Sequence, residues 1–141
     1  MLLRDILVEK GRQIHTCTPE HTLTEVIDLL VQHNCGSLLV CDRGQMVGII
    51  TERDILRAVA ETRCALDEVR TRDRMTPNPI TADANNDIGE AMGEMTARRI
   101  RHLPVLEGEE LAGIISIGDL VKAQHDELSR ENHYLKNYIQ S

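Results

Sequence analysis

An internal duplication is the feature that most constrains the fold of this chain. Residues 48–55 (Gly-Ile-Ile-Thr-Glu-Arg-Asp-Ile) recur 65 positions later as residues 113–120 (Gly-Ile-Ile-Ser-Ile-Gly-Asp-Leu). At the same spacing, residues 16–56 align without gaps to residues 81–121, with eight identities and a matching apolar pattern. Self-similarity of this kind indicates two copies of one supersecondary unit.

Each repeat has the pattern of a strand, a helix, two strands and a second helix. The first helix of each repeat opens on a capping-box pattern, Thr22-x-x-Glu25 and Asp87-x-x-Glu90. Apolar residues then recur at helical spacing in the first repeat: Leu23, Val26, Ile27, Leu30 and Val31. Two apolar strands joined by a turn are predicted next, at residues 38–40 and 46–50, and at 103–105 and 111–115. A hydroxyl residue, Thr51 or Ser116, opens the second helix.

These patterns predict an α/β (α+β) fold with two β-α-β-β-α units. Residues 1–61 are assigned to the first repeat with its N-terminal lead-in, 62–79 to a linker containing two prolines, and 80–125 to the second repeat. Residues 126–141 are assigned to an amphipathic C-terminal helix that continues to about Tyr138.

That last helix carries half of a coiled-coil pattern. Val121, Leu128 and Leu135 are seven residues apart, but Gln124 and Glu131 stand where a second seam position needs apolar residues. We expect the helix to lie on the module or on a second copy of it.

Composition excludes several function classes. The chain has 141 residues, a net charge of −7, two Tyr, and neither Phe nor Trp. An acidic chain is not attracted to nucleic acid or anionic membranes by its overall field, and stacking platforms for single strands need aromatic residues. We see no signal peptide and no apolar run long enough to span a membrane, and we expect a reduced, cytoplasmic protein.

The cysteines and histidines suggest packing rather than chemistry. There is no Cys-x-x-Cys pair and no His-x-x-x-His pair, so we predict no metal site. Three cysteines align with apolar residues of the second repeat and are interpreted as core residues: Cys17 with Ala82, Cys35 with Ile100, and Cys41 with Leu106. Cys64 in the linker is the remaining candidate for a reactive thiol.

The chain resembles the CBS domain family, named after cystathionine beta-synthase, in its tandem-pair arrangement. The resemblance rests on the duplicated Gly-Ile-Ile-(Thr/Ser)-x-x-Asp motif, on residues 101–105 (Arg-His-Leu-Pro-Val) and on residues 75–79 (Met-Thr-Pro-Asn-Pro). It covers residues 4 to 125 and leaves no room for a catalytic domain. It implies a stand-alone pair, a pseudo-twofold disc of two subdomains packed through their sheets, with two clefts that commonly hold adenosine nucleotides.

The resemblance also implies ligand-binding residues at the second helix of each repeat. The motif aspartates, Asp54 and Asp119, are expected to bind ribose hydroxyls, and Thr51 and Ser116 to reach a phosphate. A carboxylate can accept bonds from a ribose diol, and the free N–H groups of a helix start favour anions. The same residues also match ordinary capping boxes, and the two roles can coexist.

The repeats differ where a phosphate is expected. Arg101 and His102 align with Gly36 and Ser37, so the resemblance assigns the more strongly phosphorylated ligand to the second repeat. The alternative is a solvated arginine beside a surface histidine. Adenine is expected near Ile80 and Thr81, through largely backbone contacts.

We therefore expect a regulatory module that binds AMP, ADP or ATP and signals through a rearrangement of its dimer or of its last helix. It is expected to form a homodimer through its CBS subdomains, to need no cofactor and to act on an unknown regulated protein. We do not expect an enzyme, because no residues are arranged for proton transfer or nucleophilic attack. The alternatives are a ligand-free protein-interaction or dimerisation module, and the same cleft with NADH, S-adenosylmethionine or a metal ion.

Overall fold

The computed structural model describes residues 1–63 and 65–140, which form two compact units. Gln13–Pro79 form the first-repeat unit, and Met1–Arg12 with Ile80–Ser141 form the second-repeat unit. Both contain the predicted order of strand, helix, two strands and helix, so the mixed α+β fold of two similar units is confirmed. Cys64, the candidate reactive thiol, lies outside the described residues.

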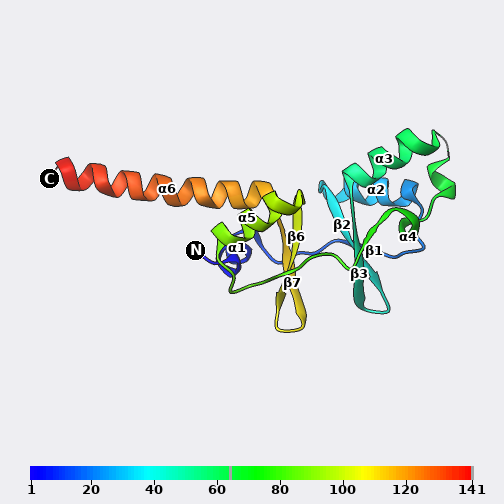
Figure 1. The fold of residues 1–141 in the computed structure, drawn as a ribbon, viewed down its shortest axis with the longest axis horizontal. Coiled ribbons are helices and arrows are strands. Elements are labelled where there is room, and N and C mark those ends of the chain that lie inside the picture. Colours follow the sequence, from blue (N-terminus) through cyan, green and yellow to red (C-terminus); the bar gives the residue numbers. More distant parts are fainter. Residues whose placement is uncertain (64, 141) are drawn as a thin grey trace. The chain divides into compact units, whose positions relative to one another are not determined.

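The first-repeat unit is built on a four-stranded sheet. Its order is β1-β2-β3-β4; β1 is parallel to β2, and the other neighbours are antiparallel. Figure 1 labels most of its elements, which in chain order are β1 (Thr16–Cys17), α2 (Leu23–His33), β2 (Ser37–Asp42), β3 (Gln45–Thr51), α3 (Glu52–Thr62), the 3-10 helix η1 (Leu66–Glu68), α4 (Thr71–Arg74) and β4 (Thr76–Pro77). The predicted linker therefore contains regular structure that belongs to this unit.

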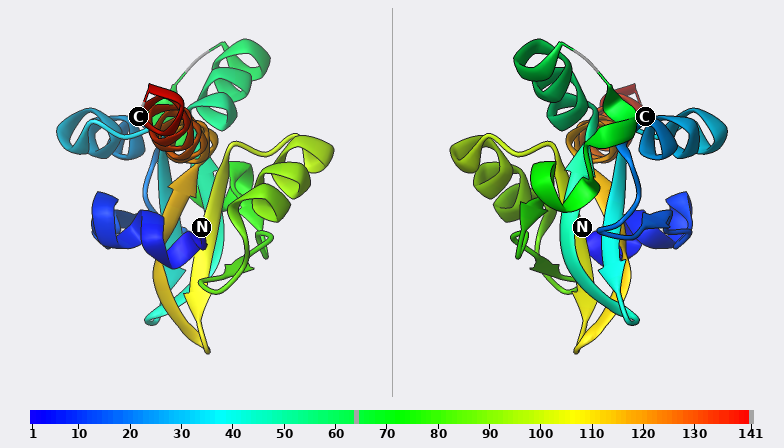
Figure 2. Two further views of the ribbon diagram at one scale, coloured as in Figure 1. Left: turned by 90° about the vertical axis from the view of Figure 1, so that its left-hand side faces the viewer. Right: turned by 90° about the vertical axis from the view of Figure 1, so that its right-hand side faces the viewer.

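The second-repeat unit repeats this plan with a three-stranded sheet of order β5-β6-β7. Its elements are α1 (Leu3–Lys10), β5 (Ala82–Asp83), α5 (Ile88–Arg98), β6 (His102–Glu107), β7 (Glu110–Ser116) and α6 (Ile117–Gln140). The β6–β7 hairpin has the same register as β2–β3, because Val105 pairs with Gly113 as Val40 pairs with Gly48. Both hairpins have an irregularity directly after that valine, which increases strand twist, and Figure 2 shows each hairpin strongly twisted.

The helix starts confirm one predicted capping box and correct the other. The Thr22 hydroxyl accepts from Glu25 N at 3.2 Å, and Glu25 accepts from Thr22 N at 3.0 Å. In α5 the reciprocal box was wrong, because Asp87 accepts from Gly89 N at 2.9 Å instead. Glycine permits this short route, since a Cβ at position 89 would lie 2.9 Å from the Asp87 carboxylate.

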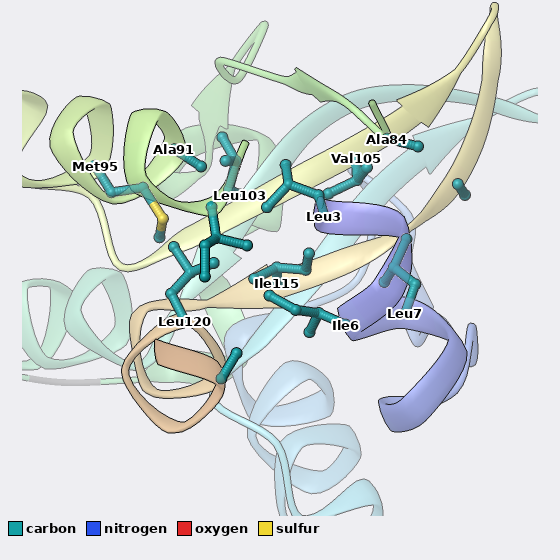
Figure 3. Close-up of a cluster of buried hydrophobic side chains, with 13 residues drawn as sticks. Leu3, Ile6, Leu7, Ala84, Ala91, Met95, Leu103, Val105, Ile115 and Leu120 are labelled. Carbon is teal, nitrogen blue, oxygen red and sulfur yellow. The ribbon is translucent and has the colours of Figure 1, made fainter. Parts of the chain in front are cut away.

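The N-terminal lead-in packs on the second repeat, although we had assigned it to the first. Leu3, Ile6 and Leu7 of α1 are at most 5% exposed and join a core that contains Ile115 of β7 and Leu120 of α6. Figure 3 shows these α1 side chains directed toward the hairpin strands, with Met95 and Ala91 entering from α5. The apolar face of α1 is buried in the second-repeat unit, so α1 belongs structurally to that unit, although the first repeat follows it in the sequence.

The lead-in of the second repeat packs on the first repeat in the same way. In the first-repeat unit, Leu23 N donates to Val69 O at 3.0 Å and Thr71 N donates to His21 O. The equivalent bonds of the second-repeat unit run from Ile88 N to Met1 O at 3.1 Å and from Leu3 N to Asn86 O. Each unit is therefore completed by the lead-in of the other repeat, an exchange that we call the crossed lead-ins.

Of the three cysteines predicted as core residues, Cys17 alone is fully buried in the core of the first-repeat unit. Cys17 is 2% exposed, Cys35 packs against the same core, and Cys41 is half-buried. Burial raises the pKa of the Cys17 thiol to about 11, even though a hydrogen bond with Thr71 acts in the opposite direction. Cys17 therefore stays protonated and unreactive at neutral pH.

Candidate ligand-binding site at the second helix of each repeat

The aspartate of the duplicated motif is bound to its own helix start in both units. In the first-repeat unit, Asp54 Oδ2 accepts from Thr51 N at 2.9 Å and from Thr51 Oγ1 at 3.2 Å. Asp54 N donates to Thr51 Oγ1 at 3.4 Å. This is a complete capping box, so the capping interpretation of these residues is confirmed.

The second-repeat unit has the same reciprocal pair with one addition. Ser116 N donates to Asp119 Oδ2 at 2.8 Å, and Asp119 N donates to Ser116 Oγ at 3.1 Å. Lys10, the last residue of α1, donates from Nζ to Asp119 Oδ2 at 2.6 Å and to Ile114 O at 2.9 Å. The crossed lead-in thus brings a cation to the α6 start.

Lys10 changes the electrostatics of this carboxylate. Partial burial acts to raise the pKa of Asp119, but the hydrogen bond from Lys10, the bond from Ser116 N and the charge of Lys10 outweigh it. The pKa of Asp119 therefore lies below its ordinary value, and the group is ionised at neutral pH. Lys10 Nζ and Ser116 N both donate to Oδ2, which fixes the orientation of the carboxylate and leaves Oδ1 out of these bonds.

The basic residues at the start of β6 lie beside the α6 start. His102 is the register partner of Ser116, and Arg101 O accepts from Ile117 N at 2.9 Å. The Arg101 side chain is exposed, whereas His102 is half-buried. The structure therefore brings together four of the predicted residues: Ser116, Asp119, Arg101 and His102.

The predicted adenine residues lie at the other edge of the same sheet. Ile80 and Thr81 directly precede β5, and β6 separates β5 from β7. Both are half-buried, and Ile80 packs against the core of the second-repeat unit. They belong to the same unit as the α6 start, and one strand, β6, lies between their strand and the strand that leads into α6.

The equivalent place in the first-repeat unit has the same backbone and different chemistry. Glu52 N donates to Gly36 O at 3.1 Å, and Ser37 pairs with Thr51. Glycine and serine thus replace Arg101 and His102, so the two helix starts differ in charge as the sequence predicted.

Sequence reasoning missed Lys10. It lies 109 positions from Asp119, and the crossed lead-ins that bring it there leave no local pattern around either residue. The histidine pairing was also missed: the His15 ring stacks on His33 with centroids 3.8 Å apart. Among residues 1–63 and 65–140, no three His, Cys, Asp or Glu side chains are grouped as a metal site would need.

A family model for the CBS domain matches the chain twice, over residues 3–61 and 68–126. The chain belongs to the CBS domain family. The two matches follow the sequence order of the repeats, whereas the compact units follow the crossed lead-ins.

Several known proteins are similar to this CBS pair over most of its length. A mitochondrial CBS domain-containing protein of Arabidopsis thaliana is 34% identical over 98% of this chain and 71% of its own length. A solved CBS-domain protein of Agrobacterium tumefaciens is 39% identical, with a TM-score of 0.85 over 88% of this chain and 99% of that one. A solved CBS domain pair in complex with 5′-methylthioadenosine and S-adenosyl-L-methionine is 26% identical, with a TM-score of 0.77 over 90% and 98%.

One similar protein is an enzyme, but the similarity covers only a small part of its sequence. Inosine-5′-monophosphate dehydrogenase of Mycobacterium tuberculosis is 33% identical over 83% of this chain, which amounts to 22% of the enzyme. The CBS pair is thus a regulatory module shared with larger proteins. No helix within the described residues is long and apolar enough to cross a membrane.

Proposed function

We propose that this CBS pair is a sensor that binds an adenosine nucleotide, AMP, ADP or ATP, at the helix starts of its duplicated motif. Binding would favour one arrangement of the dimer or of α6 to the extent that the ligand binds that arrangement more tightly.

The observation that supports this proposal is the grouping around the α6 start. An ionised, oriented carboxylate on Asp119 can accept a ribose hydroxyl, and the N–H groups of the helix start attract anions. Arg101 adjoins the α6 start through its backbone carbonyl, which accepts from Ile117 N, and its exposed guanidinium has two donors that can hold a phosphate. The second-repeat unit is therefore the stronger candidate for a phosphorylated ligand.

The similar structure supports the adenosine half of the proposal. Its two ligands, 5′-methylthioadenosine and S-adenosyl-L-methionine, both contain adenosine and carry no phosphate. For this chain, the argument for a phosphate rests on the helix start and on two basic residues, Arg101 and His102, that replace Gly36 and Ser37 of the first repeat. Arg101 is therefore the residue that an experiment must test.

A thermal-shift panel tests the proposal. Wild type and Arg101→Ala are compared with adenosine, AMP, ADP, ATP, S-adenosylmethionine, NADH and Mg²⁺, each shift taken from the variant's own ligand-free midpoint. A ligand at a hundred times its Kd adds about 2.7 kcal/mol to the free energy of unfolding. We expect a nucleotide to raise the unfolding midpoint of wild type. In Arg101→Ala, we expect the shift given by AMP, ADP or ATP to fall to that given by adenosine.

Two further variants separate binding from folding. Arg98→Ala removes the same charge from α5, where Arg98 pairs with Glu94, and should leave the ligand shift unchanged. If Ser116 acts only as a helix cap, Ser116→Ala costs about 0.5–2 kcal/mol of stability and no ligand effect is seen. If Ser116 also reaches the phosphate, the variant loses part of the ligand shift as well. No shift with any ligand, or equal losses in Arg98→Ala and Arg101→Ala, would contradict the proposal.

A ligand-independent interaction module is the second candidate, and α6 is the observation that favours it. Residues 128–140 of this helix are all exposed, including Leu128 and Leu135. On this hypothesis ligands cause no shift, and truncation after Gln124 changes the oligomeric state.

A further inference from the structure

The C-terminal half of α6 is exposed along its whole length, from residue 128 to residue 140. Its buried residues, Leu120 and Ala123, lie near its start, and Figure 1 shows the rest extending beyond the other elements of the second-repeat unit. In proteins most helical stability comes from packing of an amphipathic face, so a partner that covers residues 128–140 would stabilise this half of α6.

One face of α6 has the pattern of a coiled-coil seam. We define the α6 seam as Val121, His125, Leu128, Asn132, Leu135 and Ile139. At 3.6 residues per turn these six fall within an arc of about 80°, on a different face from Leu120 and Ala123. The four apolar members are 54%, 59%, 55% and 80% exposed, in chain order.

A coiled-coil seam needs two heptad positions, and in α6 the second one is not the position of Gln124 and Glu131 but the next along the helix. With Val121, Leu128 and Leu135 at heptad position d, position a is occupied by His125, Asn132 and Ile139. A single asparagine at position a is known to fix the register of two-stranded parallel coiled coils. In a parallel pair, Asn132 faces its own copy and the amides can bond, whereas an antiparallel pair places it against an aliphatic side chain.

The charges beside the seam fit a second copy of the same helix. Glu131 falls at position g and Lys136 at position e, which face each other across a parallel dimer. Neither residue has an opposite charge three or four positions away in its own helix. In an antiparallel dimer, e faces e, so Lys122 would instead meet Lys136 of the other copy.

We propose that two copies of this chain associate through the α6 seam as a short parallel coiled coil. This contact is separate from the proposed ligand site and does not depend on it. It differs from the expected homodimer through the CBS subdomains, because four of its six residues lie beyond the family match, which ends at residue 126.

The first test removes the apolar seam. Sedimentation or light scattering should give a larger assembly for wild type than for Leu128→Glu/Leu135→Glu, because any association through the CBS subdomains is common to both. The control His133→Glu/Gln140→Glu places two acidic residues off the seam at the same seven-residue spacing, and its assembly should match that of wild type. Equal assembly sizes for wild type and Leu128→Glu/Leu135→Glu, or a control as small as that variant, would overturn the proposal.

The second test establishes the parallel orientation without disturbing the seam. Glu131→Lys and Lys136→Glu should each weaken self-association roughly tenfold, because two attractive pairs become repulsive. The double variant should restore it, and an equimolar mixture of the two single variants should form heterodimers. Single variants that behave like wild type, or a mixture that does not associate, would overturn the parallel arrangement.

Discussion

Asp54 and Asp119 occupy the same place in the duplicated motif, yet they face different neighbours. Both carboxylates accept from the backbone of their own helix start, but Lys10 reaches Asp119 alone of the two. The side chains of Lys10 and Asp119 are 37% and 25% exposed, so the ion pair orients the carboxylate more than it stabilises the fold. The two sites are chemically unequal before any ligand arrives.

His15 gives the first-repeat unit a predicted dependence on pH. Burial and the charge of His33 both lower the pKa of His15 below 6.5. The folded chain then binds this proton less readily than the unfolded chain, so stability is complete above pH 6.5 and falls as the pH drops toward the lowered pKa. Urea denaturation of His15→Gln between pH 7.5 and 5.5 should therefore give a smaller loss than wild type.

The control for this prediction is another histidine. His133→Gln changes a residue on the exposed part of α6 and should keep the pH slope of wild type. If His15→Gln also kept that slope, the ring stack with His33 would not contribute to the pH dependence.

At the scale of elements, Gly48 of β3 and Gly113 of β7 leave the space in which the crossed lead-ins pack against each hairpin. A Cβ on Gly113 would lie 2.6 Å from Leu7 Cδ2, whereas a Cβ on Gly48 would lie 2.7 Å from Met75 Sδ and 2.8 Å from Thr76 O. A leucine methyl can rotate away, but the carbonyl of a paired strand cannot.

We therefore predict that Gly48→Ala destabilises the protein more than Gly113→Ala. Overpacking of this kind costs about 1–3 kcal/mol, and we expect Gly48→Ala at the upper end. Urea denaturation gives both values. Gly93→Ala on α5, where an added Cβ meets nothing within 4 Å, is the control. Equal losses for the two strand glycines would show that Thr76 O yields as readily as the Leu7 side chain.

Much of the fold was predictable because it is local. The hairpins, the Thr22 box and the helix starts at Thr51 and Ser116 all follow from residues within a few positions of one another. The crossed lead-ins were not predictable, since α1 is an amphipathic segment whose sequence does not say which repeat buries it. For the site, the pairing of His102 with Ser116 follows from hairpin register, whereas the position of Lys10 depends on the crossed lead-ins.

At the scale of the whole molecule, each unit has a core of its own, which predicts unequal effects of a core mutation. Leu7 is fully buried in the second-repeat unit, so Leu7→Ala should cost about 2–5 kcal/mol. Hydrogen exchange should then lose more protection in β6 and β7 than in β2 and β3. Val8→Ala on the same helix, where the side chain is 77% exposed, should change little. Equal loss in both hairpins would indicate that the units unfold together.

The crossed lead-ins also set an order for assembly during synthesis. At about 5–20 residues per second, a ribosome needs roughly ten seconds to proceed from α1 to the strands that bury it. The first-repeat unit is complete once residue 79 has emerged, while Leu3, Ile6 and Leu7 still wait for β7 and α6. Although α1 is made before both hairpins, it is thus among the last segments to be covered, and during that interval its apolar face is open to chaperones and to neighbouring nascent chains.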